Sequence, residues 1–195
     1  MNLLQKILRS TRSVFSSKEL ILHGNDINTE NIRAQIGYYV RKGDLYHIRR
    51  SLYAKNKDYD RLEAATKIMT PAYISFETVL RQAGIVFQYY DSIFVASTHS
   101  RTIICDKQEY VFRRIKEHIL TNPLGIKIQD AYSIATPERA FLDLLYLNKD
   151  YYLDNPRPLN WKLVFEILPI YANKRMSKVV EEHYTAFKQN FQETP

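Results

Sequence analysis

The chain has 195 residues, of which 45% are apolar, so it is long enough to bury a core within one domain or two small ones. Lysine and arginine number 28 against 21 aspartates and glutamates, and the net charge is +7. A single cysteine excludes an internal disulfide and fits a reducing cytoplasm, and no apolar stretch reaches the roughly 18 residues of a membrane span.

The positive charge is concentrated near the N-terminus. Residues 1–60 carry 11 basic and 6 acidic residues, whereas the last 65 residues carry 8 of each. Such a basic segment is typical of the part of a protein that contacts a polyanion, although a solubilising surface explains the charge equally well.

The first sixty residues predict three helices. An amphipathic helix is expected over residues 2–13, an interpretation that we prefer to an organelle presequence. Ser16 and Glu19 have the spacing of a capping box, which opens a short second helix. Asn28 is expected to cap a third helix, which stops at Gly43. The apolar stripe of this third helix comprises Ile32, Ile36, Tyr39 and Val40.

A small hairpin follows the third helix. Two β-prone runs, residues 45–48 and 52–54, flank Arg49 and Arg50, so adjacent arginines are expected to be exposed at its tip. Three helices and a basic hairpin in this order predict a winged helix-turn-helix, whose third helix enters the major groove of DNA while the hairpin contacts phosphates. Winged helices also serve as protein-docking modules, and this alternative stays open. The candidate DNA-binding residues are Asn31, Arg33, Tyr38, Arg41, Lys42, Arg49 and Arg50.

Here the sequence resembles a known family. The stretches FSSKEL, residues 15–20, and RKGDLYHIRRSLY, residues 41–53, are similar to the N-terminal region of AbiEi-type antitoxins from bacterial type IV toxin–antitoxin systems, which act in abortive infection as a phage defence. The family usually has glycine where this chain has Ser51, so the hairpin turn is expected to differ. The resemblance continues through residues 71–75, 84–85 and 134–147.

The resemblance implies a function for each half of the chain. It implies that the winged helix binds promoter DNA and represses its own operon. It also implies that the C-terminal part opposes an AbiEii-type nucleotidyltransferase toxin, a functional partner that need not form a stable complex.

The domain boundary is expected near residues 55–58, which are polar and lack hydrophobic periodicity. Residues 1–57 then form the winged helix-turn-helix, and residues 58–195 form a mixed α/β C-terminal domain, within an overall α+β fold.

In the helix that begins at Thr136, Arg139 and Asp143 are expected to pair on the surface. Other helices are expected at residues 61–69 and 75–84 and on both sides of Pro169, and strands at residues 92–97, 101–105, 110–115 and 125–129.

The C-terminal domain offers candidate residues for antitoxin function but no enzyme motif. No Gly-rich phosphate loop, His-Glu-x-x-His helix or Cys-x-x-Cys pair is present, so we expect a non-enzyme without cofactor or metal. Asp106 and Glu109 leave a metal-dependent nuclease as an alternative, and a stand-alone winged-helix transcription factor with a ligand- or partner-binding domain is another. The candidates for antitoxin function, expected to be semi-exposed beside strands, are Tyr73, Ser75, Arg113, Arg114 and Lys116; a solvated sheet edge explains them equally well.

Overall fold

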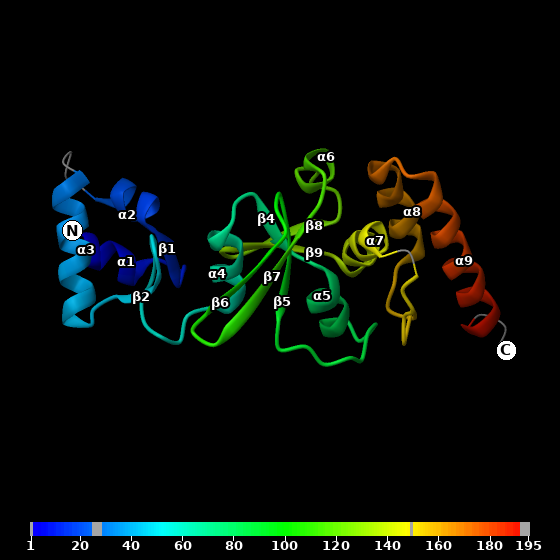
Figure 1. Ribbon diagram of the computed structural model, residues 1–195, viewed down its shortest axis with the longest axis horizontal. Helices are drawn as coiled ribbons and strands as arrows, with labels where there is room; N and C mark the ends of the chain where they lie inside the picture. The colour runs from blue at the N-terminus through cyan, green and yellow to red at the C-terminus, as the bar shows by residue number, and fades with distance from the viewer. Residues whose placement is uncertain (1, 25–28, 149, 192–195) are drawn as a thin grey trace.

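The computed structural model describes residues 2–24, 29–148 and 150–191, and its α+β class confirms the expectation from the sequence. The molecule is elongated: helices and a small sheet from the N-terminus lie at one end, a mixed sheet lies in the middle, and the C-terminal helices lie at the other end (Figure 1). We call residues 2–54 the N-terminal unit and residues 61–191 the C-terminal unit.

The N-terminal unit packs its helices against an antiparallel sheet with strand order β1-β3-β2. Its elements are α1 (Leu3–Arg9), β1 (Val14–Ser16), α2 (Ser17–His23), α3 (Thr29–Lys42), β2 (Tyr46–Arg49) and β3 (Leu52–Ala54). Their apolar faces enclose a small core of Leu3, Ile7, Phe15, Leu20, Ile32, Ile36 and Leu45. The arrangement is compatible with a winged helix-turn-helix whose third helix is α3 and whose wing is the β2–β3 hairpin.

Local interactions set the ends of these helices. Ser16 Oγ accepts a hydrogen bond from the Glu19 amide at 3.2 Å, and Glu19 Oε2 accepts one from the Ser16 amide at 2.8 Å, which confirms the capping box of α2. The helix α3 ends at Lys42, and the next residue, Gly43, has a φ of +83°, which suits glycine. The first helix ends at Arg9, earlier than expected, because the next residue is already extended. The expected cap of α3, Asn28, lies outside the described residues.

The C-terminal unit is built on a mixed sheet with strand order β6-β7-β5-β4-β9-β8, in which β5–β7 and β4–β9 are parallel pairs. Its strands are β4 (Ala72–Ile74), β5 (Ile93–Ser97), β6 (Arg101–Cys105), β7 (Gln108–Arg114), β8 (Ile126–Gln129) and β9 (Tyr132–Ala135). Its helices are α4 (Arg61–Ile68), α5 (Phe76–Gln82), α6 (Glu117–Leu120), α7 (Pro137–Leu147), α8 (Trp161–Ile167), the 3-10 turn η1 (Leu168–Tyr171) and α9 (Lys174–Phe191). Within the part of the chain that the structure describes, no helix combines the length and the apolar character needed to cross a membrane.

The helix α7 lies between the sheet and the C-terminal helices (Figure 1). It begins as the sequence predicts, with Thr136 Oγ1 accepting a hydrogen bond from the Arg139 amide at 3.3 Å and Pro137 in the first turn. Its residues from Glu138 to Leu145 are all buried, so α7 forms the centre of the larger core.

Three features of the sheet differ from expectation. The strands β4 and β9, of three and four residues, were not predicted. The strand β8 was expected to be half-buried, but it is an outer strand and Ile128 is 84% exposed. An edge strand has a neighbour on one side only, which leaves its residues open to solvent.

The two units share a packed interface. Glu63 Oε2 of α4 accepts hydrogen bonds from the amide and hydroxyl of Ser13 at 2.8 and 2.7 Å. Asp106, in the β6–β7 turn, accepts hydrogen bonds from the hydroxyls of Tyr46 and Tyr59 at 3.0 and 2.9 Å. Four apolar residues of the N-terminal unit belong to the larger core, namely Val14, Ile48, Leu52 and Ala54. Residues 55–60, which include the predicted boundary, form neither helix nor strand, and the units on either side of them are in contact.

Candidate nucleic-acid interface

The helix α3 divides into a buried face and a polar face. Ile32 and Ile36 are buried, and Tyr39 and Val40 are half-buried, as the 3.6-residue period predicts. The opposite face is exposed and carries the predicted contact residues Asn31, Arg33, Tyr38, Arg41 and Lys42. This face presents basic and hydrogen-bonding groups of the kind that read and bind DNA.

The C-terminal end of α3 carries one local ion pair. Lys42 Nζ lies 3.3 Å from Asp44 Oδ2, and the hydrogen bond and charge of Asp44 raise the pKa of Lys42. The ammonium group remains exposed to solvent and can exchange this partner for a phosphate.

The tip of the β2–β3 hairpin places its two arginines differently. Arg50 is exposed, as expected. Arg49 is half-buried, so the expectation of full exposure is wrong for this residue. The strand register shifts between His47 and Arg49. The Nη1 atom of Arg49 is buried and has no hydrogen-bond partner among the described residues.

Three of the predicted DNA-binding residues line one pocket of about 390 Å³, which we call the basic pocket. They are Arg33 of α3 and Arg49 and Arg50 of the hairpin. The other polar residues that line the pocket are Ser16, Ser17, Lys18, Ser51 and Lys67. The structure thus gathers side chains from α2, α3, α4 and the hairpin, and among the described residues that line the pocket five are basic and none is acidic.

One acid contacts a lining residue of the basic pocket without lining the pocket itself. Glu19 Oε1 lies 2.5 Å from Lys67 Nζ and 2.9 Å from Arg12 Nη1. Burial alone raises the pKa of Glu19, but the hydrogen bonds from Lys67 and Ser16 and the charge of Lys67 outweigh it, and the net pKa is lowered. Glu19 is therefore ionised at neutral pH and joins α4 to the start of α2.

Two residues of the basic pocket were not predicted. Lys18 lies inside the capping-box segment. The sequence shows its charge, but it does not show that Lys18 lies close to the hairpin. Lys67 lies beyond the predicted boundary at residue 57, and no local pattern could have assigned it to a site on the N-terminal unit.

Two candidates for antitoxin function, Tyr73 and Ser75, are buried, so their expected semi-exposure is wrong. Both donate hydrogen bonds to Asp143 Oδ2, at 2.9 and 2.8 Å, and Tyr171 donates to Asp143 Oδ1 at 2.6 Å. Burial, together with the neighbouring carboxylate, raises the pKa of the Tyr73 and Tyr171 hydroxyls well above the ordinary value, so both stay protonated as donors.

The ion pair of Arg139 and Asp143 forms, but it is not on the surface. Arg139 Nε lies 3.3 Å from Asp143 Oδ1, and both side chains are fully buried. The Arg139 guanidinium also donates to the carbonyl oxygens of Leu124 at 2.8 Å and Ile119 at 2.6 Å. A spacing of four residues predicted the pair correctly and its environment wrongly, because the neighbouring elements cover this side of α7.

The remaining candidates lie at the end of β7. Arg113 is half-buried, and its Nη1 donates to the two carboxylate oxygens of Glu77 at 3.0 and 2.8 Å. Arg114 and Lys116 are exposed. Only these two keep the solvent access that a partner contact requires.

The acids of the alternative nuclease site are engaged elsewhere. The carboxylate of Asp106 accepts hydrogen bonds from Tyr46 and Tyr59, and the hydroxyl of Ser92 donates to Glu109. In residues 2–24, 29–148 and 150–191, no group of three or more histidine, cysteine, aspartate or glutamate side chains could hold a metal ion.

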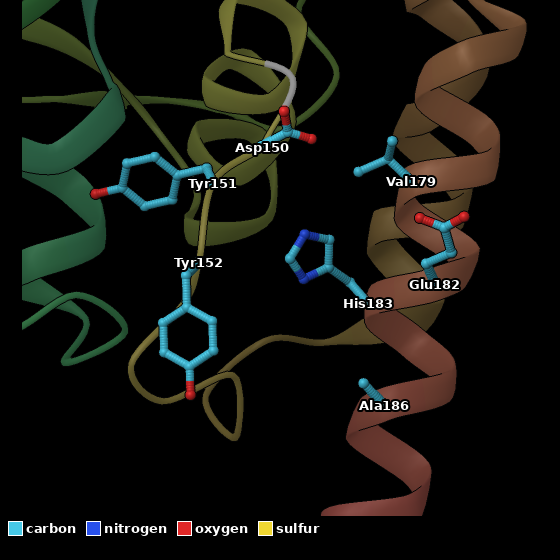
Figure 2. Close-up of a pocket in the computed structure, with 7 residues that line it drawn as sticks. All are labelled: Asp150, Tyr151, Tyr152, Val179, Glu182, His183 and Ala186. Atoms are coloured by element: carbon cyan, nitrogen blue, oxygen red, sulfur yellow. The ribbon is translucent and has the colours of Figure 1, made fainter.

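A second pocket, of about 480 Å³, lies between residues 150–152 and α9 (Figure 2). His183 projects from α9 toward residues 150–152, whereas Tyr151 turns away from α9 (Figure 2). The His183 ring meets the Phe141 ring edge-on, with centroids 5.5 Å apart, and burial lowers its pKa. No hydrogen bond joins His183 to a hydroxyl, thiol or carboxylate in the described part of the chain, so the pocket presents no nucleophile–base pair.

The features that can bind a polyanion therefore lie together: the polar face of α3, the hairpin tip and the basic pocket, which these elements form with α2 and α4. Arginine, lysine and serine are among the side chains that contact DNA phosphates. No protein-family model and no curated protein matches this chain.

Proposed function

We propose that the protein binds double-stranded DNA through α3 and the β2–β3 hairpin, and that it acts in the cytoplasm as the antitoxin and autorepressor of a type IV toxin–antitoxin operon. The observation that carries the DNA-binding proposal is the basic pocket, because it joins Arg33 of the third helix to Arg49 and Arg50 of the hairpin without an acidic lining residue. In a winged helix-turn-helix these two elements contact the major groove and the adjacent backbone, so positive charge shared by both fits a duplex.

The antitoxin role rests on the sequence resemblance to AbiEi-type antitoxins. On this proposal the C-terminal unit opposes a nucleotidyltransferase toxin. Arg114 and Lys116 are the exposed positions from which a contact could be made, whereas Tyr73 and Ser75 serve the buried network and are no longer proposed for this role.

The DNA-binding proposal is tested by titrating the chain with its own promoter duplex over a series of salt concentrations. If four to six phosphates are neutralised, log affinity falls against log salt with a slope of about −4 to −5. Arg50→Ala should flatten the slope by about one unit on any sequence. Lys57→Ala is the matched control, because Lys57 is an exposed basic residue in the linker after β3.

Sequence preference is tested separately at α3. Arg33→Ala should cost about 1–3 kcal/mol on the preferred operator and relax discrimination between operators. Binding that does not depend on salt, or no binding to any duplex, contradicts the DNA-binding proposal.

The antitoxin proposal is tested by growth after induction of the nucleotidyltransferase encoded beside this gene. Co-expression of the full chain should restore growth, and residues 61–195 should also protect, since they contain the whole of the C-terminal sheet. If the fragment accumulates in folded form and fails while the full chain protects, antitoxicity does not reside in the C-terminal unit alone. If no nucleotidyltransferase gene neighbours this one, the stand-alone transcription factor becomes the better proposal.

A further inference from the structure

The basic pocket crosses the boundary between the two units. Lys67 enters it from the last turn of α4, whereas the rest of the lining comes mainly from α2, α3 and the hairpin. The Ser51 carbonyl accepts a hydrogen bond from the Ser17 amide at 2.9 Å, which holds the hairpin tip against the start of α2. The bond from Lys67 to Glu19 holds α4 against the same helix, so the walls of the pocket are formed before any ligand arrives.

Four of the five basic residues that line the basic pocket have no counter-ion among the described residues, and the fifth, Lys67, is paired with Glu19. Within the described residues, no ion pair involves Lys18, Arg33, Arg49 or Arg50. The buried Nη1 of Arg49 lacks a hydrogen-bond partner there as well. A half-buried guanidinium beside other cations is unfavourable, because desolvation and like-charge repulsion add. An anion bound in the pocket would relieve both.

We propose that the basic pocket is a phosphoryl-binding site, and that Lys67 of the C-terminal unit binds the phosphate together with Lys18, Arg49 and Arg50. Guanidinium groups match a phosphate in a bidentate manner, ammonium groups act as point charges, and the hydroxyls of Ser17 and Ser51 add neutral donors. Lys67 can serve both Glu19 and an anion, because an ammonium group has three donors.

A volume of about 390 Å³ lies within the range of ligand pockets. The phosphate can come from the DNA backbone, in which case the inference rests on the proposed function, or from a free phosphorylated molecule. In the first case the DNA-binding surface does not end with the hairpin but includes α4, so a duplex is held by both units at once.

The full chain and four variants provide the test. Lys18→Gln and Lys67→Gln each remove one proposed ligand, Lys67→Arg keeps the charge, and Lys57→Gln removes a charge outside the pocket. Promoter binding is measured over a salt series. Binding of inorganic phosphate and pyrophosphate is measured by calorimetry and by the rise in Tm, against sodium chloride of the same ionic strength.

We expect Lys18→Gln and Lys67→Gln each to flatten the salt slope by about one unit, while Lys67→Arg and Lys57→Gln keep the wild-type slope. Lys18 is exposed, so its replacement tests the site even if Lys67→Gln weakens the contact between the units. If both glutamine variants have flatter salt slopes and the chain does not bind free phosphate, the phosphate that the pocket binds comes from the DNA backbone.

The two proposals fail in distinguishable ways. Binding of phosphate or pyrophosphate that is lost in Lys18→Gln, in a chain that binds no duplex, supports the pocket and contradicts the proposed function. Salt-dependent binding of the promoter with unchanged slopes in both glutamine variants, and no binding of free phosphate, overturns the pocket and leaves the proposed function standing.

Discussion

Asp143 shows how a charged side chain can be buried at the centre of the larger core. Its two carboxylate oxygens accept hydrogen bonds from Arg139, Tyr73, Ser75 and Tyr171. A buried charge with a partner at each position is tolerated, whereas the loss of one partner leaves the other charge uncompensated.

Replacement of Asp143 by asparagine should therefore destabilise the fold strongly. The buried Arg139 guanidinium loses its counter-charge, and we expect the free energy of unfolding to fall by about 3–5 kcal/mol in urea denaturation. Glu182→Gln is the control, because it breaks an exposed pair in which Lys178 lies 4.0 Å away, and it should change stability little. An Asp143→Asn chain with the wild-type urea midpoint would contradict the buried network.

His183 should make stability depend on pH below neutrality. Burial lowers its pKa, so the unfolded chain, with an ordinary histidine pKa of about 6.5, binds a proton at higher pH than the folded chain. Between these two values the unfolded state holds more protons, and stability rises with pH. Neutral, buried His183 therefore contributes to stability above a pH of about 6.5. This contribution is lost as the pH falls from there toward the lowered pKa of the folded state.

The measurement is the urea midpoint between pH 5 and pH 7.5. His183→Gln should show a weaker loss of stability toward acid than the wild type. His118→Gln removes an exposed imidazole and serves as the control. An equal loss in the wild type and in His183→Gln would show that other groups govern this range.

At the scale of the element, the β2–β3 hairpin turns through a residue that is not suited to its backbone. Ser51 has φ of +62°, in the left-handed region that favours glycine. Serine carries a Cβ atom, so it adopts this conformation less readily than glycine does.

Ser51→Gly should therefore stabilise the protein. Relief of the left-handed strain exceeds the extra entropy that glycine loses on folding, and we expect a gain of about 0.5–1 kcal/mol in the free energy of unfolding. The same change at Ser10, whose φ is −63°, should not stabilise. If Ser51→Gly unfolds at a lower urea concentration than the wild type, the contacts of the Ser51 side chain stabilise the protein by more than the left-handed backbone conformation destabilises it.

At the scale of the whole molecule, the interface between the units should decide how well the N-terminal unit folds alone. A fragment of residues 1–60 loses Glu63 and Lys67 as partners and leaves four apolar residues of the larger core uncovered: Val14, Ile48, Leu52 and Ala54. A fragment of residues 1–69 keeps α4 against β1. We expect the longer fragment to unfold at clearly higher urea concentration and to bind the promoter more tightly, as a salt titration can show. Equal stability of the two fragments would mean that α4 adds nothing to the N-terminal unit.

Local sequence was sufficient for much of the fold, because the responsible contacts lie within a few residues. The capping box at Ser16, the helix stop at Gly43 and the start of α7 at Thr136 each depend on neighbours in the chain. The strands β5, β6 and β7 were predicted for the same reason, since β-prone runs and turn residues are local signals. The polar face of α3 followed from the period of its apolar stripe.

Tertiary structure alone decided which charges are buried and which are gathered. The spacing of Arg139 and Asp143 is the same on a solvated helix and in a core, and only the packing of β4, α6 and η1 around α7 separates the two. Lys67 likewise reaches the basic pocket because α4 packs against the N-terminal unit, far from Arg33 in the sequence. Periodicity reports which face of one element is apolar, whereas burial of a polar group depends on partners that other elements supply.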